Sequence, residues 1–479
     1  MKKKYLNFFA ITKSIILVLL LNVIWSSCSN ELNINDDPNK PTDVPLNVLL
    51  TASEANLAYT LGGDGTRMPA SIVQHYAGHR GQPLEYGQYN ITASATDNLW
   101  SNLYEVMYDL RSIQSKAKES DSKIYLGISQ ILEAYTITVT TDLFGDVPYT
   151  EALQGSVNIN PKYDTQESIY TSALKLIDDG IANVKANAGL KPGTDDLIYA
   201  GNITKWEKFG NSLKLRLLNH LSKRNPNAAK TFLDTNPALI NSTSDNAKVV
   251  FGSSASNANP IHQFDVLSGR KDNAICNTIV DKMKVYNDPR ITEYFLPIVN
   301  GTLAGQIIGN KPGGDDDDSG EAKFSRVGRA FASVNSQVRL LSAAEVNFIK
   351  AEIYKRSSDD ALAKVSYEKA ISEDFVDLGI SNVSSFLSLP EVSYNNTLQR
   401  IMEQKWVTMF QASFESWVDW RRTGYPMLTP ATTNRTNGVI PRKLSLPQTE
   451  INLNADKVKD GPGIPVPFET LKGKVWWDQ

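Results

Sequence analysis

Apolar residues recur at intervals of three and four positions over most of the chain from about residue 45 onward. This spacing gathers apolar side chains on one face of a helix, as in amphipathic helices that pack on a core. Few segments alternate apolar and polar residues as strands do. The pattern predicts at least eight helices and a mainly all-α fold. The clearest stripes are Leu46, Leu49, Leu50, Ala52 and Leu57; Trp100, Leu103, Tyr104, Met107 and Leu110; Ile128, Ile131, Leu132 and Tyr135; Ile169, Tyr170, Ala173, Leu174 and Ile177; and Met402, Trp406, Met409, Phe410, Phe414 and Trp417.

One stretch has the spacing of a tetratricopeptide-like repeat, in which small and aromatic residues let two antiparallel helices pack closely. The repeat is degenerate, because Asn347 and Lys350 replace its early Trp and Leu. Residues 206–213 match half of a second repeat, and helix pairs are expected around 126–143 and 166–185. We predict irregular repeats stacked as a right-handed superhelical scaffold. The residues that fit the repeat are Ala351, Tyr354, Ala363, Tyr367 and Ala370.

Long segments without helical periodicity lie between and after these helices. Loops of this length in a compact protein are usually functional or strongly packed on the scaffold. We therefore expect helices on one side of the fold and a loop-rich, ligand-binding face on the other. The segments are 60–98, 186–203, 235–275, 296–340 and 423–475.

The N-terminus has the pattern of an export signal. Four lysines, Lys2 to Lys4 and Lys13, precede residues 15–25, which are apolar except for Asn22, and Ser26-Ser27-Cys28 follows. This apolar run is too short to span a membrane, which takes about 20 helical residues. Small residues before Cys28 suit cleavage that leaves this cysteine as a lipid-modified N-terminus. We expect a signal peptide at 1–27, a lipid-anchored flexible tether at 28–44 and one domain at 45–479. The alternative is an ordinary secreted protein in which Cys28 is buried or paired.

Composition and charge narrow the function classes. The 479 residues are 41% hydrophobic, which is typical of a globular protein with a large core. Four of the 49 basic residues lie within 1–27, so the rest carries 45 bases against 52 acids, a net charge of −7. This balance argues against nucleic-acid binding, which needs a concentrated basic face. Two cysteines exclude a disulfide framework and a cysteine-built zinc site, and Cys276 is expected to be a buried thiol.

The sequence contains only weak signals for a metal site or a catalytic site. His75 and His79 are four apart, but Gly78 lies between them and no glutamate follows His75 as in a zinc protease. Asp315 and Asp317 begin a run that resembles a calcium loop, although its twelfth place is an arginine, Arg326. We expect a solvated acidic loop there, with a structural calcium as the alternative and no other cofactor. No serine lies in a nucleophile elbow and no carboxylate pair is singled out, so the sequence does not predict an enzyme.

Several local runs, in a fixed order behind the export signal, carry a resemblance to a known family. Together they resemble the SusD/RagB family of nutrient-binding outer-membrane lipoproteins over the whole mature chain. The run Asn33-Ile-Asn-Asp-Asp-Pro-Asn39 and Ile440-Pro-Arg442 are most similar to its second SusD-like branch. The other runs are Thr141-Asp-Leu-Phe-Gly-Asp-Val-Pro-Tyr-Thr-Glu-Ala152, Pro161-Lys-Tyr-Asp-Thr-Gln-Glu-Ser-Ile-Tyr170, Trp206-Glu-Lys-Phe-Gly-Asn-Ser-Leu-Lys-Leu-Arg216, Leu341-Ser-Ala-Ala-Glu-Val-Asn-Phe-Ile-Lys-Ala-Glu352, Gln404-Lys-Trp406, Trp417-Val-Asp-Trp-Arg-Arg-Thr-Gly-Tyr-Pro426 and Val475-Trp-Trp-Asp478.

The resemblance implies four tetratricopeptide-like helix pairs and a loop-rich ligand face. It also implies an outer-membrane lipoprotein facing the cell exterior, whose partner is a TonB-dependent β-barrel (SusC-like) transporter that it covers like a lid. The ligand would be an oligosaccharide, which we favour slightly, or an oligopeptide. A secreted hydrolase and a helical-repeat assembly scaffold are the alternatives from other classes. The motifs themselves are interpreted as scaffold: Gly145 and Pro148 shape a turn, Asp146 satisfies its backbone donors, and Asp419 pairs with the following arginines.

Ligand contacts are expected from the loops, where exposed aromatic rings can stack on sugars or peptide side chains. The best candidate is the glycine-broken segment 74–89. Its alternative interpretation is that the tyrosines pack on the scaffold while Arg80 makes a surface ion pair. The candidates are His75, His79, Arg80, Tyr86 and Tyr89, with Tyr294 and Phe331 as weaker ones near loop edges.

Overall fold

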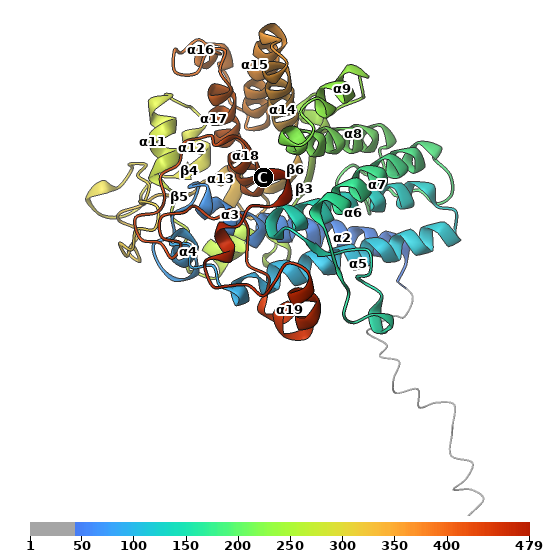
Figure 1. Ribbon diagram of the computed structural model, residues 1–479. Helices are drawn as coiled ribbons and strands as arrows, with labels where there is room; N and C mark the ends of the chain where they lie inside the picture. Colours follow the sequence, from blue (N-terminus) through green and yellow to red (C-terminus); the bar gives the residue numbers. More distant parts are fainter. Residues whose placement is uncertain (1–43) are drawn as a thin grey trace, which may run out of the picture. The chain divides into compact units, whose positions relative to one another are not determined.

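The computed structural model describes residues 44–479. Its contacts divide the chain into two units, Met1–Pro45 and Leu46–Gln479, and the second unit contains every element named below (Figure 1). The predicted signal peptide at 1–27 and Cys28 lie outside the described residues, as does almost all of the predicted tether. No helix within residues 44–479 is both long and apolar enough to cross a membrane.

Helices make up most of the second unit, as the periodicity predicts. The N-terminal half contains α2 (Leu46–Gly62), α3 (Asp64–Ile72), α4 (Gly81–Gly87), α5 (Asp97–Glu119), α6 (Lys123–Phe144), α7 (Gln166–Ala186), α8 (Ile203–His220) and α9 (Ala228–Asp234). The rest contains α10 (Pro260–His262), α11 (Asn277–Val285), α12 (Ile291–Tyr294), α13 (Arg329–Ala332), α14 (Ala343–Arg356), α15 (Asp360–Asp377), α16 (Val383–Leu387), α17 (Leu398–Thr408), α18 (Ser413–Thr423), α19 (Gln448–Leu453) and α20 (Ala455–Asp460).

The strands of the described residues are short and form three two-stranded antiparallel sheets. The longest pairing joins β3 to β6, with Ala247 opposite Leu341 and Val250 opposite Gln337. These ribbons tie loops to the helical body rather than forming a layer of their own. The strands are β1 (Val147–Pro148), β2 (Tyr163–Asp164), β3 (Ala247–Val250), β4 (Phe295–Leu296), β5 (Arg326–Val327) and β6 (Gln337–Leu341).

Successive helices pack on one another as antiparallel pairs, seen in Figure 1 as the series α5, α6, α7 and α8 and the pair α14 and α15. Two glycines allow α6 and α7 to approach closely. A Cβ on Gly127 would lie 2.5 Å from the Gly180 carbonyl oxygen, and one on Gly180 would lie 2.7 Å from Ile131 Cγ1. Side chains at either position would force these helices apart.

The repeat predicted near residue 351 is confirmed as the helix pair α14 and α15. Ala351, Ala363, Tyr367 and Ala370 are all buried between or beside these helices. Small residues at the contact positions reduce the distance between the helix axes, and the Tyr367 ring packs edge-on against Phe348 at 6.1 Å. The mainly helical prediction is therefore correct, and four of the five repeat positions are core positions, while Tyr354 is partly exposed.

The family motifs form internal contacts in the scaffold, as interpreted from the sequence. Gly145 ends α6 with a φ of 87°, a conformation that most side chains disfavour. Two details differ from the expectation: Pro148 lies in β1, and the Asp146 carboxylate accepts from the backbone N–H of Gln166 on α7 at 2.8 Å rather than from its own turn. Arg422 pairs with Asp419 at 2.8 Å. Arg421 differs from the expected ion pair, because its guanidinium donates to the Asp142 and Arg442 carbonyls.

The predicted irregular segments contain more helix than their periodicity indicated. Segment 60–98 includes α3 and α4, and segment 423–475 includes α19 and α20. These helices have six to nine residues, so they are too short for a clear repeat in the sequence and depend on tertiary packing. Pro69 also lies inside α3. A proline within a helical pattern usually marks the end of a helix, so the sequence pattern would have ended α3 before this residue.

Candidate functional site

The two histidines predicted to contact ligand are buried in the protein. His75 Nε2 donates to the Trp406 carbonyl at 2.9 Å, and Nδ1 lies 2.9 Å from the Ser413 hydroxyl. Burial lowers the pKa of His75 to about 3, so this imidazole is neutral. His79 is buried as well, and its Nδ1 accepts from the Asp318 backbone N–H at 3.1 Å. Both side chains therefore hold loops on the scaffold and do not face solvent.

The predicted aromatic contacts require a similar correction. Tyr86, Tyr89, Tyr294 and Phe331 are all buried, so their rings offer no exposed face for stacking. The Tyr89 hydroxyl accepts from the Ala431 backbone N–H at 3.1 Å. Tyr294 and Phe331 pack around one ring, Phe410, with centroid distances of 5.4 and 5.5 Å. Tyr86, Tyr294 and Phe331 lie on the short helices α4, α12 and α13, and Tyr89 follows α4. These segments have no helical periodicity in the sequence, yet they pack on the scaffold and bury their rings.

Arg80 is the one member of the predicted set with substantial exposure. Its Nε pairs with Asp272 at 2.6 Å, and Arg270 pairs with the other oxygen of the same carboxylate at 2.8 Å. The alternative interpretation of segment 74–89 therefore agrees with the structure: buried tyrosines and a partly exposed Arg80 ion pair.

The acidic loop is organised around Asp318 rather than the predicted calcium ligands. The Asp318 carboxylate pairs with Arg326 at 3.1 Å and accepts three backbone N–H groups, those of Ala322, Lys323 and Phe324. Asp317 is exposed, with one oxygen 3.8 Å from His79 Nδ1. No group of three or more His, Cys, Asp or Glu residues in the described part of the chain is placed to hold a metal. Calcium binding by Asp315 and Asp317 stays an untested prediction.

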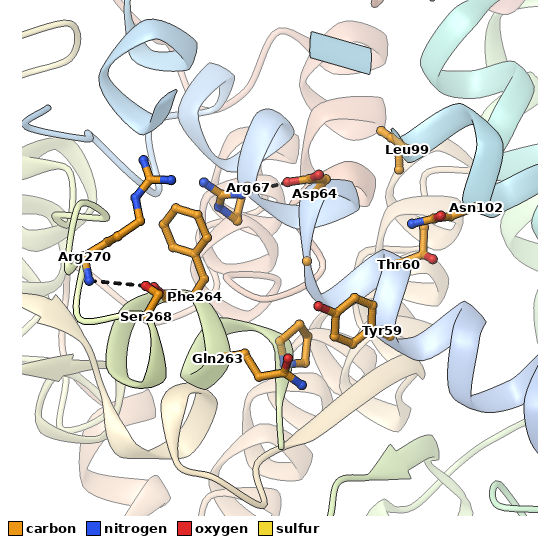
Figure 2. A pocket seen from close by; sticks show the side chains of 12 residues that line it. Tyr59, Thr60, Asp64, Arg67, Leu99, Asn102, Gln263, Phe264, Ser268 and Arg270 are labelled. Carbon is orange, nitrogen blue, oxygen red and sulfur yellow. Dashed lines mark hydrogen bonds and ion pairs between the residues drawn. The ribbon is translucent and has the colours of Figure 1, made fainter. Parts of the chain in front are cut away.

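A separate hollow of about 380 Å³ lies where α2, α3 and α5 meet the segment 260–270. We call it the Phe264 pocket. A pocket of this size is within the range of small-ligand sites. Its lining includes Tyr59, Thr60, Asp64, Arg67, Leu99, Asn102, Gln263, Phe264, Ser268 and Arg270 (Figure 2).

Arg67 and Phe264 form the centre of the Phe264 pocket. The Arg67 guanidinium carbon lies 3.5 Å from the centre of the Phe264 ring, within the range of a cation–π contact. Arg67 also pairs with Asp64 at 2.7 Å, one turn earlier on α3, and donates to Gln82 at 3.1 Å. Because the guanidinium is held from three directions, the ring and the Asp64 carboxylate are fixed relative to each other.

The Phe264 ring is carried by a π-helical turn, η6 (Gln263–Leu267), which follows α10. The Asn259 side chain begins this segment by accepting the backbone N–H groups of Ile261 and His262. Asp265, the next residue after Phe264, is buried, and burial raises its pKa to about 7 although Asn273 donates to it at 2.9 Å. Asp265 thus helps to fix the turn, and the Phe264 ring lines the pocket between two guanidinium groups, with the Arg67 and Arg270 carbons 3.5 and 5.0 Å from its centre (Figure 2).

The walls of the Phe264 pocket combine aromatic surface with hydrogen-bonding groups. Tyr59 on α2 is 43% exposed and lies across the pocket from Phe264, which is partly exposed (Figure 2). Asn102, Gln263 and Asp64 supply amide and carboxylate groups at the rim. This combination can hold a ligand that has both apolar faces and hydroxyl groups.

The sequence did not mark this pocket. Residues 61–66 and Phe264 lie within the segments 60–98 and 235–275, which have no helical periodicity. The only available signal was that Tyr59 falls outside the apolar stripe of its helix. The pocket joins residues 59–67, 99–102 and 260–270, which only the tertiary fold brings together.

Comparison with known protein families shows the family to which the chain belongs. A family described as starch-binding and associating with the outer membrane, the second SusD-like family, matches residues 38–447, which is most of the chain. The chain belongs to the SusD-like family. Proteins of this family are carbohydrate-binding proteins and not enzymes. No curated protein matched the chain.

Solved SusD-like structures share the fold. A chitin-binding protein is 23% identical with a TM-score of 0.79, and the alignment covers 91% of this chain and 100% of that one. A chitin-binding SusD homolog from Flavobacterium johnsoniae is 24% identical (TM-score 0.77; 89% and 98% covered). A SusD homolog from Bacteroides uniformis ATCC 8492 is 25% identical (TM-score 0.76; 90% and 99% covered).

Proposed function

We propose that this SusD-like protein is a lipid-anchored receptor on the cell surface that captures oligosaccharide in the Phe264 pocket. It then delivers the sugar to a TonB-dependent outer-membrane transporter. The observation that carries this proposal is the fixed arrangement of Phe264, Arg67 and Asp64 opposite the exposed Tyr59 ring. Aromatic rings pack against the apolar faces of a pyranose, while carboxylate and guanidinium groups hydrogen-bond its hydroxyls.

Two further observations support an oligosaccharide over a peptide. The matching family is described as starch-binding, and two of the similar structures are named as chitin-binding. The pocket also offers a paired Asp64 and Arg67 rather than a single uncompensated charge. Hydroxyl groups can both donate to the carboxylate and accept from the guanidinium, so a neutral sugar satisfies the pair without disrupting it.

The experiment is isothermal titration of residues 29–479 with maltooligosaccharides, N-acetylglucosamine oligosaccharides and mixed peptides. We expect saturable binding of one oligosaccharide series without turnover. Phe264→Ala should weaken that binding by about tenfold or more, because it removes the stacking surface and the contact that holds Arg67.

Phe232→Ala provides the matched control. Phe232 lies on α9, outside the pocket, and its ring contacts a cation, Lys214 Nζ, at 5.2 Å. This variant should bind as the wild type does. Binding of peptides alone, or equal affinity for wild type and Phe264→Ala, would contradict the proposal.

A further inference from the structure

A second hollow of about 680 Å³ runs along α5, beside α19. We call it the α5 groove. One wall is α5 from Trp100 to Asp109, and the opposite wall includes Glu450 and Leu453 of α19. The Thr449 backbone N–H donates to Asp97 at 3.0 Å and fixes the start of α19 against the start of α5. The two walls are therefore positioned independently of any ligand.

Three aromatic residues follow one another along α5 at intervals of four: Trp100, Tyr104 and Tyr108. This spacing places them on the same face of the helix, one turn apart. The first two are anchored, since the Trp100 and Tyr104 rings lie 4.8 Å apart and the Tyr104 hydroxyl donates to the Pro148 carbonyl at 2.6 Å. Tyr108 is 54% exposed and continues the row into solvent. An exposed tyrosine beside an anchored aromatic pair is a preformed stacking surface.

The polar lining of the α5 groove is acidic. Glu105, Asp109 and Glu450 line it, and no Lys or Arg does. Within residues 44–479, none of these three carboxylates takes part in a salt bridge. Burial, and then the neighbouring Glu105, raise the pKa of Asp109. Glu450 Oε1 already accepts hydrogen bonds from the Tyr163 hydroxyl at 2.9 Å and the Asn454 amide at 2.7 Å. Carboxylates accept hydrogen bonds from hydroxyl groups and repel anions, so the groove suits an uncharged polyhydroxyl ligand rather than a sulfated or uronic one.

The α5 groove adjoins the Phe264 pocket. Both are built on the packed helices α2 and α5. On α2, Asn56 lines the groove and Tyr59, one turn later, lines the pocket. On α5, Ser101 lines the groove and the next residue, Asn102, lines the pocket. The two hollows are therefore lined by neighbouring residues on both helices.

We propose that the oligosaccharide site extends from the Phe264 pocket along α5, with Tyr108 as its outer stacking platform. The preferred ligand is then a linear, neutral oligosaccharide long enough to occupy both hollows. This inference rests on the proposed function, because it assigns the second half of the same site. It adds two properties, a dependence of affinity on chain length and a preference for uncharged sugars.

The test uses wild type, Tyr108→Ala and Phe264→Ala, each titrated with a disaccharide, a tetrasaccharide and an octasaccharide of the maltose and N-acetylglucosamine series. Wild type should bind the octasaccharide more tightly than the disaccharide. Tyr108→Ala should weaken octasaccharide binding by about tenfold and leave disaccharide binding unchanged, since only the longer ligand reaches α5. Phe264→Ala should weaken both. Alanine is a strong helix former, so the exposed substitution preserves α5.

A second variant and a second ligand refine the test. Tyr108→Phe keeps the ring and should bind the octasaccharide as wild type does. A sulfated oligosaccharide should gain no affinity with length. The extension is wrong, while the proposed function stands, in either of two cases: if wild type binds the disaccharide and the octasaccharide equally well, or if Tyr108→Ala binds the octasaccharide as tightly as wild type does. If neither saccharide series binds at all, the proposed function fails and the extension fails with it.

Discussion

The Arg422 guanidinium on α18 pairs with the Glu352 carboxylate on α14, and Arg422 Nη2 lies 2.6 Å from Glu352 Oε2. Both side chains are almost fully buried. The Asp419 carboxylate lies 2.8 Å from the same guanidinium. It also forms an ion pair with the Lys405 ammonium of α17, at 2.7 Å. These ion pairs join three helices, including one of the tetratricopeptide-like pair. The charged residues of the Trp417–Pro426 motif therefore hold helices of the scaffold together, and we do not expect them to contact ligand.

Removing Arg422 should destabilise the fold. Arg422→Ala leaves the buried Glu352 and Asp419 carboxylates without this partner, which typically costs about 3–5 kcal/mol in the free energy of unfolding. Urea denaturation would measure the change. The control is Lys175→Ala, which breaks an exposed pair with Asp179 and should have little effect. Equal stability of Arg422→Ala and wild type would show that the pair does not hold the helices together.

A buried histidine should make stability depend on pH. His220 Nε2 lies 3.0 Å from Glu415 Oε2, and Nδ1 lies 3.4 Å from Asp142 Oδ2 and 3.0 Å from the Tyr170 hydroxyl. Burial would lower the pKa of His220, but Glu415 and Asp142 outweigh it and raise the pKa from 6.5 to about 9. His220 is therefore charged in the folded protein at neutral pH.

Since the folded pKa exceeds the unfolded one, this stabilisation is fully present below pH 6.5 and is lost as pH rises to about 9. The loss should be on the order of 3 kcal/mol in the free energy of unfolding. Denaturation of wild type and His220→Gln across this range measures it. Wild type should lose more stability than the variant with rising pH, and parallel curves would refute the assignment.

The sequence was a good guide to the scaffold and a poor guide to the site. Helix pairs such as α14 and α15 were predictable because their apolar and small residues follow a local period that burial imposes. The Phe264 pocket was not, because its members come from three distant segments with no shared spacing. Aromatic loop residues such as Tyr89 were misassigned for a related reason: whether a loop ring is buried depends on how the loop folds back, here through Gly78, where a Cβ would lie 2.2 Å from Pro83.

Surface tethering rests on Cys28, which lies outside the described residues. Cys28→Ala removes the thiol to which lipid would be attached, so the protein should move from the membrane fraction to the soluble fraction. Cell fractionation with immunodetection measures this, and Ser27→Ala, which keeps a small residue before the cysteine, is the control. Unchanged membrane association of Cys28→Ala would refute the lipid anchor.

The transporter partner can be sought directly. Purification of the wild-type protein from outer membranes in mild detergent should recover a large TonB-dependent β-barrel in a stoichiometric complex. Mass spectrometry of the purified complex identifies the partner. Recovery of the protein alone, under conditions that preserve other membrane complexes, would argue for a receptor that works without a barrel.

A crystal structure of residues 29–479 with the tightest-binding oligosaccharide tests the central claim most directly. The account predicts a sugar ring packed against Phe264, hydroxyl groups within hydrogen-bond distance of Asp64 and Arg67, and Tyr59 on the opposite side of the ligand. A saccharide bound elsewhere on the protein, with the Phe264 pocket empty, would contradict it.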